Sequence, residues 1–83
     1  MKIKTYTGEE IRILRNKLAL NQSEFWKFFM TTQSGGSRYE SGRDIPSPVQ
    51  FLLNIAFGTD KKREEIITAL RALGRLPKTN RRS

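Results

Sequence analysis

The chain contains no cysteine and no histidine among its 83 residues. Without cysteine it has no disulfide framework and no sign of an oxidising compartment. Without either residue it lacks the usual zinc ligands and the Ser-His or Cys-His couple that activates a nucleophile. The double glycine Gly35-Gly36 lacks the following lysine and the spacing of a phosphate-binding loop. We therefore expect no enzyme, no metal site and no cofactor.

Long hydrophobic runs are also missing from the sequence. No stretch approaches the roughly 20 apolar residues of a membrane span. Residues 1–6 do not resemble the start of a secretory signal peptide. The length favours one small domain, too short to bury a large enzyme core. By default, we expect a cytoplasmic protein that does not span a membrane.

Acidic residues are scarce, because eight Asp and Glu stand against sixteen Lys and Arg, for a net charge of +8. A balance this basic favours a polyanionic partner, either nucleic acid or an anionic membrane, although a soluble protein can also simply be basic. Most of the acidic residues lie where first helical turns are expected, and negative charge there suits the helix dipole. These residues are Glu9, Glu10, Glu24, Glu64 and Glu65.

Two helix starts are marked by reciprocal capping patterns. Thr7 and Glu10 fit a capping box, and Asn21 and Glu24 offer a similar start for a second helix. Apolar residues follow each start at helical spacing. They are Ile11, Leu14 and Leu18 for the first helix, and Phe25, Phe28 and Phe29 on the expected inner face of the second.

Three further helices are expected after the second. The third runs from about residue 33 to 40, with Thr31 or Thr32 as its cap and Gly42 as its end. The run Ser47-Pro48-Val49-Gln50 predicts a fourth start, with a capping serine, proline at the first helical position and, as in a capping box, glutamine at the third. The fifth begins near Asp60. The expected apolar faces comprise Phe51, Leu52, Ile55 and Ala56 in the fourth helix and Ile66, Ile67, Leu70 and Leu73 in the fifth.

Residues 21–43 hold two short helical patterns separated by a three- or four-residue turn, and the second pattern is polar. This is typical of a helix-turn-helix, in which one helix packs across and the next offers hydrogen-bonding side chains to a DNA groove. The stretch resembles the Cro/repressor (Xre-type) helix-turn-helix family. The resemblance rests on Leu20-Asn21-Gln22 and on Ser37-Arg38-Tyr39-Glu40-Ser41-Gly42, and it covers roughly residues 8–58.

The resulting fold prediction is an all-α, five-helix repressor-like domain with a central helix-turn-helix. Residues 1–7 form an N-terminal arm and residues 8–58 the DNA-binding domain. Residues 59–74 form a C-terminal helix that offers a dimer contact, and residues 75–83 a basic disordered tail. Within the arm, Lys2 to Tyr6 alternate between polar and apolar residues, so a short strand is an alternative there.

The resemblance places candidate DNA-binding residues on both helices of the motif. Gln22 matches a glutamine that bonds a DNA phosphate, and Arg43 matches a basic position that meets the phosphate backbone. Gln33 is suited to bond adenine in bidentate fashion, and Arg38 to take guanine or a phosphate. The alternative for each is an ordinary solvated side chain. The full set is Gln22, Thr32, Gln33, Ser34, Ser37, Arg38, Ser41 and Arg43.

Four more residues are expected to shape the motif. The resemblance implies a partly buried ion pair between Arg15 and Glu40, which ties the first helix to the third. The family usually has alanine where Trp26 stands, a large aliphatic residue where Gly36 stands, and glycine where Met30 stands. We interpret Trp26 and Gly36 as a size exchange that conserves core volume.

These features predict a sequence-specific DNA-binding transcriptional regulator, a repressor that binds a palindromic operator in double-stranded DNA as a homodimer. One subtype of such a regulator is an antitoxin that represses its own promoter and binds a toxin-like protein partner. The alternative is a protein-interaction or membrane-surface module that uses basic helices without reading bases. Residues 60–75 come closest to the pattern of a membrane-surface helix.

Overall fold

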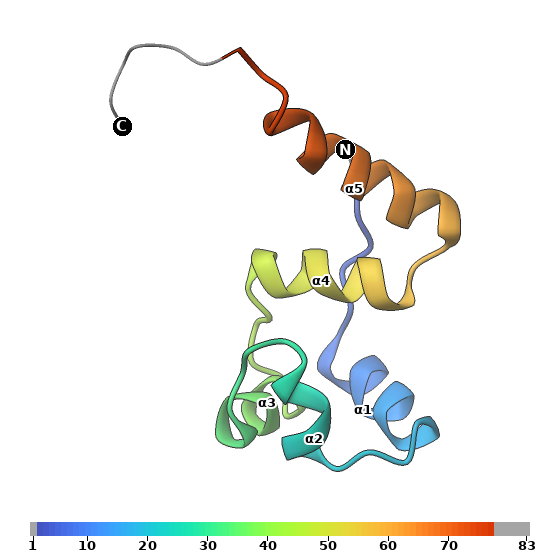
Figure 1. Cartoon of the computed structure of the whole chain (residues 1–83). Coiled ribbons are helices and arrows are strands. Elements are labelled where there is room, and N and C mark those ends of the chain that lie inside the picture. Colours follow the sequence, from blue (N-terminus) through green and yellow to red (C-terminus); the bar gives the residue numbers. More distant parts are fainter. Residues whose placement is uncertain (1, 78–83) are drawn as a thin grey trace.

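The computed structural model describes residues 2–77 and contains five helices and no strand within that range. The helices are α1 (Gly8–Lys17), α2 (Gln22–Lys27), α3 (Gln33–Glu40), α4 (Ser47–Phe57) and α5 (Asp60–Leu73). Helices α1, α2 and α3 form one group, α4 lies across it, and α5 packs on the far side of α4 (Figure 1). The predicted all-α, five-helix fold is confirmed. Most of the predicted tail, from residue 78 on, lies outside the described residues.

Local capping determines where the first three helices begin. Thr7 accepts a hydrogen bond from the backbone N–H of Glu10, and the Glu10 carboxylate accepts one from the backbone N–H of Thr7. Asn21 and Glu24 form the same reciprocal pair at α2. At α3 the cap is Thr32, whose hydroxyl accepts from the backbone N–H three residues later at 3.1 Å. All three starts confirm the predictions, because such caps depend only on neighbouring residues.

The predicted start of α4 is wrong in detail. Pro46 is the N-cap and makes no side-chain hydrogen bond, Ser47 is the first helical residue, and Pro48 comes second. The extended backbone of Pro46, with φ −60° and ψ 151°, leads directly into the helix. The amide of Gln50 cannot complete a capping box because it is buried and bonded to the N-terminal arm.

Two amide side chains of α4 hold the N-terminal arm. Gln50 accepts from the backbone N–H of Tyr6 and donates to its carbonyl, both at 2.9 Å. Asn54 accepts from the N–H of Lys4 at 2.9 Å and donates to its carbonyl at 2.8 Å. The two amides supply the donor and the acceptor that a neighbouring strand would otherwise give to the backbone of Lys4 and Tyr6. In residues 2–6 the backbone of Lys4 and Tyr6 thus bonds to a helix and not to a strand, and the arm crosses α4 in Figure 1.

This docking also explains why the expected inner face of α4 is partly wrong. Leu52 and Ala56 are exposed, whereas Gln50, Leu53 and Asn54 are buried. A buried amide is stable only when its hydrogen bonds are satisfied, and here the backbone of the arm satisfies them. The buried face of α4 is thus partly polar, which an apolar pattern does not predict.

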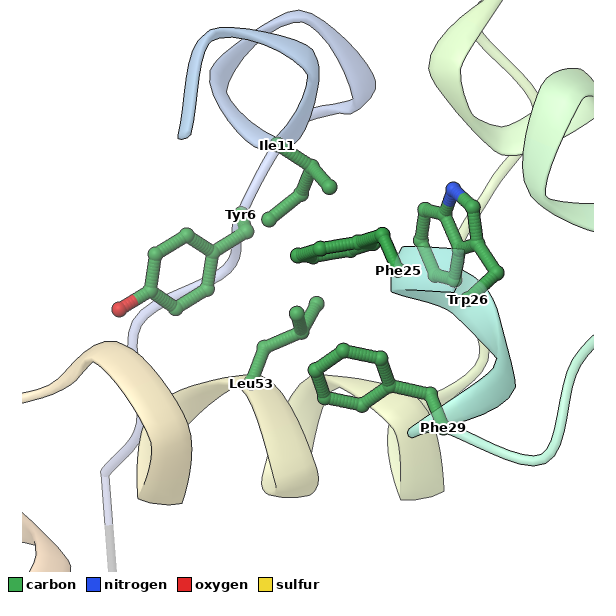
Figure 2. Packing of buried hydrophobic residues seen from close by; sticks show 6 residues of the cluster. All are labelled: Tyr6, Ile11, Phe25, Trp26, Phe29 and Leu53. Carbon is green, nitrogen blue, oxygen red and sulfur yellow. The ribbon is translucent and has the colours of Figure 1, made fainter. Parts of the chain in front are cut away.

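The core lies between α1, α2, α4 and the arm (Figure 2). Phe25 is at its centre, with ring centroids 5.2 Å from both Trp26 and Phe29 and 6.0 Å from Phe57. Such spacings suit edge-to-face and offset aromatic contacts. The six residues drawn in Figure 2 are Tyr6, Ile11, Phe25, Trp26, Phe29 and Leu53.

Phe28, predicted on the inner face of α2, is instead 78% exposed. Successive residues of a helix are rotated by about 100°, so a face that contains Phe25 and Trp26 turns Phe28 towards solvent. The fully buried Trp26 therefore decides which side of α2 faces the core. The prediction is therefore correct for Phe25 and Phe29, which are buried, and wrong for Phe28 alone.

Helix α5 contacts the rest of the protein on one side only. Thr59 caps it, and Ile66 is fully buried beneath it. The other apolar residues of the expected stripe, Ile67, Leu70 and Leu73, are exposed to increasing degrees towards its end. No helix within residues 2–77 combines the length and apolar character that crossing a membrane requires.

Met30 lies in the turn between α2 and α3 with φ 56°, in the left-handed region, and its side chain is 91% exposed. A side chain in that region costs roughly 1–2 kcal/mol of folding free energy, which explains why the Cro/repressor family that this stretch resembles prefers glycine there.

Because Met30 contributes little packing, Met30→Gly should stabilise the fold by about 0.5–1 kcal/mol, once the larger backbone entropy that glycine gives the unfolded chain is subtracted. Denaturant titration measures this change. Met30→Ala keeps the Cβ atom and should bring no comparable gain, so equal gains from both variants would contradict the explanation.

Candidate nucleic-acid interface

Helices α2 and α3 are the two helices of the helix-turn-helix, and they meet at Trp26 and Gly36. Trp26 is fully buried, and a Cβ atom added at Gly36 would lie 2.1 Å from its Cδ1 atom. No side chain fits at such a distance, so only glycine allows α3 to pack on the indole. The size exchange expected from the sequence is present in the structure.

The carboxylate of Glu40, at the end of α3, is the centre of a hydrogen-bond cluster. The guanidinium of Arg15 donates to it from Nε at 2.8 Å and from Nη2 at 2.9 Å. The indole Nε1 of Trp26 donates at 2.8 Å, and Nε2 of Gln22 donates at 3.1 Å. The Glu40 side chain is only 3% exposed. One carboxylate thus joins α1, α2 and α3.

Two opposing effects act on the ionisation of Glu40. Burial raises the pKa of its carboxyl group, but the hydrogen bonds from Arg15, Trp26 and Gln22 and the charge of Arg15 lower it more. The net pKa is below the usual value of a glutamate. The hydrogen bond to Glu40 in turn raises the pKa of Arg15. Both groups are therefore charged at neutral pH, and the carboxylate acts only as an acceptor.

The cluster extends to the surface through a second glutamine. The Nε2 atom of Gln33 donates to Oε1 of Gln22 at 2.7 Å. Gln22 is the first residue of α2 and Gln33 the first residue of α3. Both were predicted to contact DNA separately, and the structure brings them into direct contact with one another.

The other candidate DNA-binding residues surround the start and the outer side of α3. The exposed ones are Thr32, Gln33, Ser34, Arg38, Ser41 and Arg43, while Ser37 and Gln22 are half-buried. Two of the hydroxyl groups have structural bonds: Thr32 caps the helix, and Ser41 donates to the carbonyl of Ser37 at 2.9 Å. Along α3, residues 33, 34, 37, 38 and 41 recur at spacings of three and four, so they lie on one polar surface that begins at the N-terminus of the helix.

Arg38 and Arg43 lie together at the other end of this surface. The backbone N–H of Arg43 donates to the carbonyl of Arg38 at 3.0 Å. Both residues line a surface hollow of about 340 Å³, together with Asp44. The two arginines give this end of the surface a local positive charge, which suits an anionic backbone.

Sequence reasoning missed two of the contacts that Glu40 makes. The indole N–H of Trp26 was not assigned a partner, although a buried tryptophan usually finds one. The bond from Gln22 to Glu40 was missed because Gln22 was considered only as a phosphate ligand. Both contacts are made to Glu40. Glu40 is the one acidic residue of α3, and a single carboxylate in an otherwise uncharged or basic helix could have indicated that it has hydrogen-bond donors nearby.

Comparison with protein families finds a match to the RsaL-like HTH domain over residues 12–56. The match includes α2, α3 and most of α1 and α4. It supports the helix-turn-helix expected from the sequence but does not single out the Cro/repressor family. Comparison with curated proteins and with solved structures finds no match.

Proposed function

The chain belongs to the RsaL-like helix-turn-helix family, and on that premise we propose that it is a sequence-specific DNA-binding transcriptional regulator. We further propose that it is a repressor and that it binds a palindromic operator as a homodimer. Its chemistry is that of a binding protein, with no catalytic step. The net charge of +8 supports an anionic partner.

The observation that carries this proposal is that α3 is bound to α1 and α2 on one side and exposes polar side chains on the other. In a helix-turn-helix the second helix enters the major groove with its N-terminal residues on the base edges. Helix α3 has a polar outer side, and its inner side is fixed to α1 and α2 through Glu40 and Trp26. A rigid helix with exposed amide, hydroxyl and guanidinium groups is what such reading requires.

The residues divide into two roles under this proposal. Gln33 and Ser34, at the start of α3, read base edges, because side chains there lie deepest in the groove. Gln22 and Arg43 contact phosphates on either side, and Arg38 takes guanine or a phosphate. Thr32, Ser37 and Ser41 complete the contact surface.

The experiment that tests the proposal compares two substitutions on two duplexes: one selected by the wild-type protein from a random pool, and one with the same bases scrambled. Gln33→Ala should cost about 1–3 kcal/mol on the selected duplex and much less on the scrambled one. Arg43→Ala should weaken both duplexes about equally and make the slope of log affinity against log salt shallower by about one. Gel shift or fluorescence anisotropy measures both.

Equal losses from Gln33→Ala on the two duplexes would mean that α3 does not read bases. The rival function is a protein-interaction or membrane-surface module that uses its basic helices without base readout. Its signature would be DNA binding that is independent of sequence and steeply sensitive to salt.

A homodimer is supported by the exposed apolar residues of α5. Ile67, Leu70 and Leu73 lie on one helix at spacings that bring them to a common side, and the described chain leaves them uncovered. Two copies joined there would present two α3 helices to the half-sites of a palindrome. We expect light scattering at micromolar concentration to report a dimer, with or without the selected duplex.

Two matched substitutions, Leu70→Lys and Thr68→Lys, test whether the dimer forms through the apolar side of α5. Both residues are exposed on α5, but only Leu70 belongs to the apolar side. Leu70→Lys should give a folded monomer, whereas Thr68→Lys should remain a dimer. A wild-type protein that stays monomeric even on DNA would refute this interface.

An autoregulating antitoxin is the narrower form of this proposal. In that form a toxin-like protein would be the partner, and the protein would repress its own promoter. An adjacent small gene of the toxin type would support this subtype, and its product should bind the purified regulator.

A further inference from the structure

Helices α1, α2 and α4 border a surface hollow of about 420 Å³, and every residue that lines it is apolar. The buried rings of Phe25 and Phe29 form its floor. Exposed side chains form its walls: Leu18 from the end of α1, Phe28 from the end of α2 and Leu52 from α4. We call this hollow the apolar groove.

The walls of the apolar groove form one exposed apolar patch. Phe28 is the most exposed of the three, and Leu18 and Leu52 are exposed beside the same hollow. Single exposed apolar residues are ordinary on a protein surface, whereas a contiguous patch marks a site of interaction. Aromatic side chains that become buried in a partner's pocket often contribute most to binding. The groove therefore has the composition of a binding surface.

The shape and lining of the groove favour a helix as its ligand. Sites for small molecules contain a few polar groups that fix the orientation of the ligand, and none of the described residues that line the groove has a polar side chain. Strand addition needs a free backbone edge, whereas helices border this groove. An amphipathic helix can instead place apolar residues, at spacings of three, four and seven, into a groove between helices.

The charges beside the groove determine which kind of helix it suits. Lys17 precedes Leu18 and Lys27 precedes Phe28, and both lysines are exposed. Consecutive Cα atoms are about 3.8 Å apart, so these long side chains reach the rim of the groove. Neither lysine forms an ion pair within residues 2–77. Helix α4 has no charged residue, and Glu24 is held at the start of α2 by its capping bond. The rim is thus positively charged.

A second copy of this chain does not match the charge of the rim. The exposed apolar residues of α5, Ile67, Leu70 and Leu73, lie in a stretch that contains Arg71 and no acidic residue. Docked in the groove, this side of α5 would bring Arg71 towards the two lysines. Like charges that face each other across an interface disfavour binding. The groove therefore suits a different, acidic partner.

We propose that the apolar groove binds an amphipathic helix of a partner protein, with apolar residues on the side that enters the groove and acidic residues beside them. Phe28 and Leu18 make apolar contacts with this helix, and Lys17 and Lys27 pair with its acidic residues. The groove contains no residue of α3 and no proposed DNA contact, so this binding goes beyond DNA recognition and does not depend on it.

The test uses three synthetic peptides of about 15 residues, a length at which helices begin to form in water. The first has leucines spaced by three, four and seven positions, with glutamates beside them. The second has the same composition in an order without an apolar side, and the third has lysine in place of glutamate. Fluorescence anisotropy at low salt measures the affinity of the protein for each. The first peptide should bind at least about tenfold more tightly than the other two.

Two sets of substitutions locate the binding in the groove. Phe28→Ala should weaken the first peptide at least about tenfold, because it removes the exposed aromatic side chain. Met30→Ala is the matched control: it removes another exposed apolar side chain, which does not line the groove, and should leave the affinity unchanged. Both replaced side chains are exposed, so both variants should fold. Lys17→Glu combined with Lys27→Glu should reverse the preference between the acidic and the basic peptide.

Four results would overturn the proposal. If the first two peptides bind equally, the groove does not recognise an amphipathic helix. If the acidic and basic peptides bind equally, the lysines do not select the partner. If light scattering shows that Phe28→Ala converts a wild-type dimer into a monomer, a second copy fills the groove. If the protein binds phosphatidylglycerol vesicles through Phe28 and binds none of the peptides, the groove is a membrane contact.

Discussion

Replacing Trp26 by alanine should destabilise the fold by about 3–5 kcal/mol, a large part of the total stability of so small a domain. The side chain is fully buried, contacts Phe25 and Phe29 in the core, and fills the space that Gly36 leaves in α3. Gly36, which faces the indole from α3, has no side chain that could extend into the resulting cavity. Thermal or denaturant unfolding followed by circular dichroism measures the loss.

Trp26→Phe separates the two contributions of this residue. Phenylalanine keeps most of the buried volume but removes the indole N–H that donates to Glu40 at 2.8 Å. The variant should therefore fold and lose less stability than Trp26→Ala. A melting curve that Trp26→Ala leaves unchanged would exclude the packing of Trp26 on Gly36.

The second large effect is expected from Glu40→Ala, also about 3–5 kcal/mol, because it leaves a buried charge without its partner. The side chain of Arg15 is only 12% exposed, and it would lose both hydrogen bonds to the carboxylate. The indole N–H of Trp26 would lose its acceptor as well. Unfolding in denaturant, compared with the wild type, gives the value.

An exposed ion pair provides the control for this prediction. Glu65 pairs with Lys62 at 3.1 Å on the surface of α5, and such pairs contribute little in water. Glu65→Ala should therefore leave the unfolding curve almost unchanged. If Glu40→Ala and Glu65→Ala had equally small effects, Glu40 would not be the centre of a buried cluster.

The parts of the fold that the sequence predicted are those that depend on nearby residues. The caps at Thr7, Asn21 and Thr32 are each completed within a few positions, so their residue types alone indicate the helix starts. The partners of Gln50 and Asn54 lie 44 and 50 positions away, and no local pattern connects them. For this reason the polar inner face of α4 was missed.

The site likewise has contacts that the sequence predicted and contacts that it did not. The pair of Arg15 and Glu40 was predicted from the resemblance, and the structure forms it. The contact of Gln22 with Gln33 depends on how far the turn separates the first residues of α2 and α3, which the sequence does not state. The rotation of α2 that exposes Phe28 depends on Trp26 fitting against Gly36, a contact between two helices.

The central claim is that this protein recognises a DNA sequence and not only the charge of DNA. The most direct test is a titration of the wild-type protein with the selected and the scrambled duplex at several salt concentrations. Affinity for both should fall as salt rises, because each phosphate contact releases counterions. The selected duplex should remain at least about a thousandfold tighter throughout. Equal affinities for the two duplexes at every salt concentration would contradict the account.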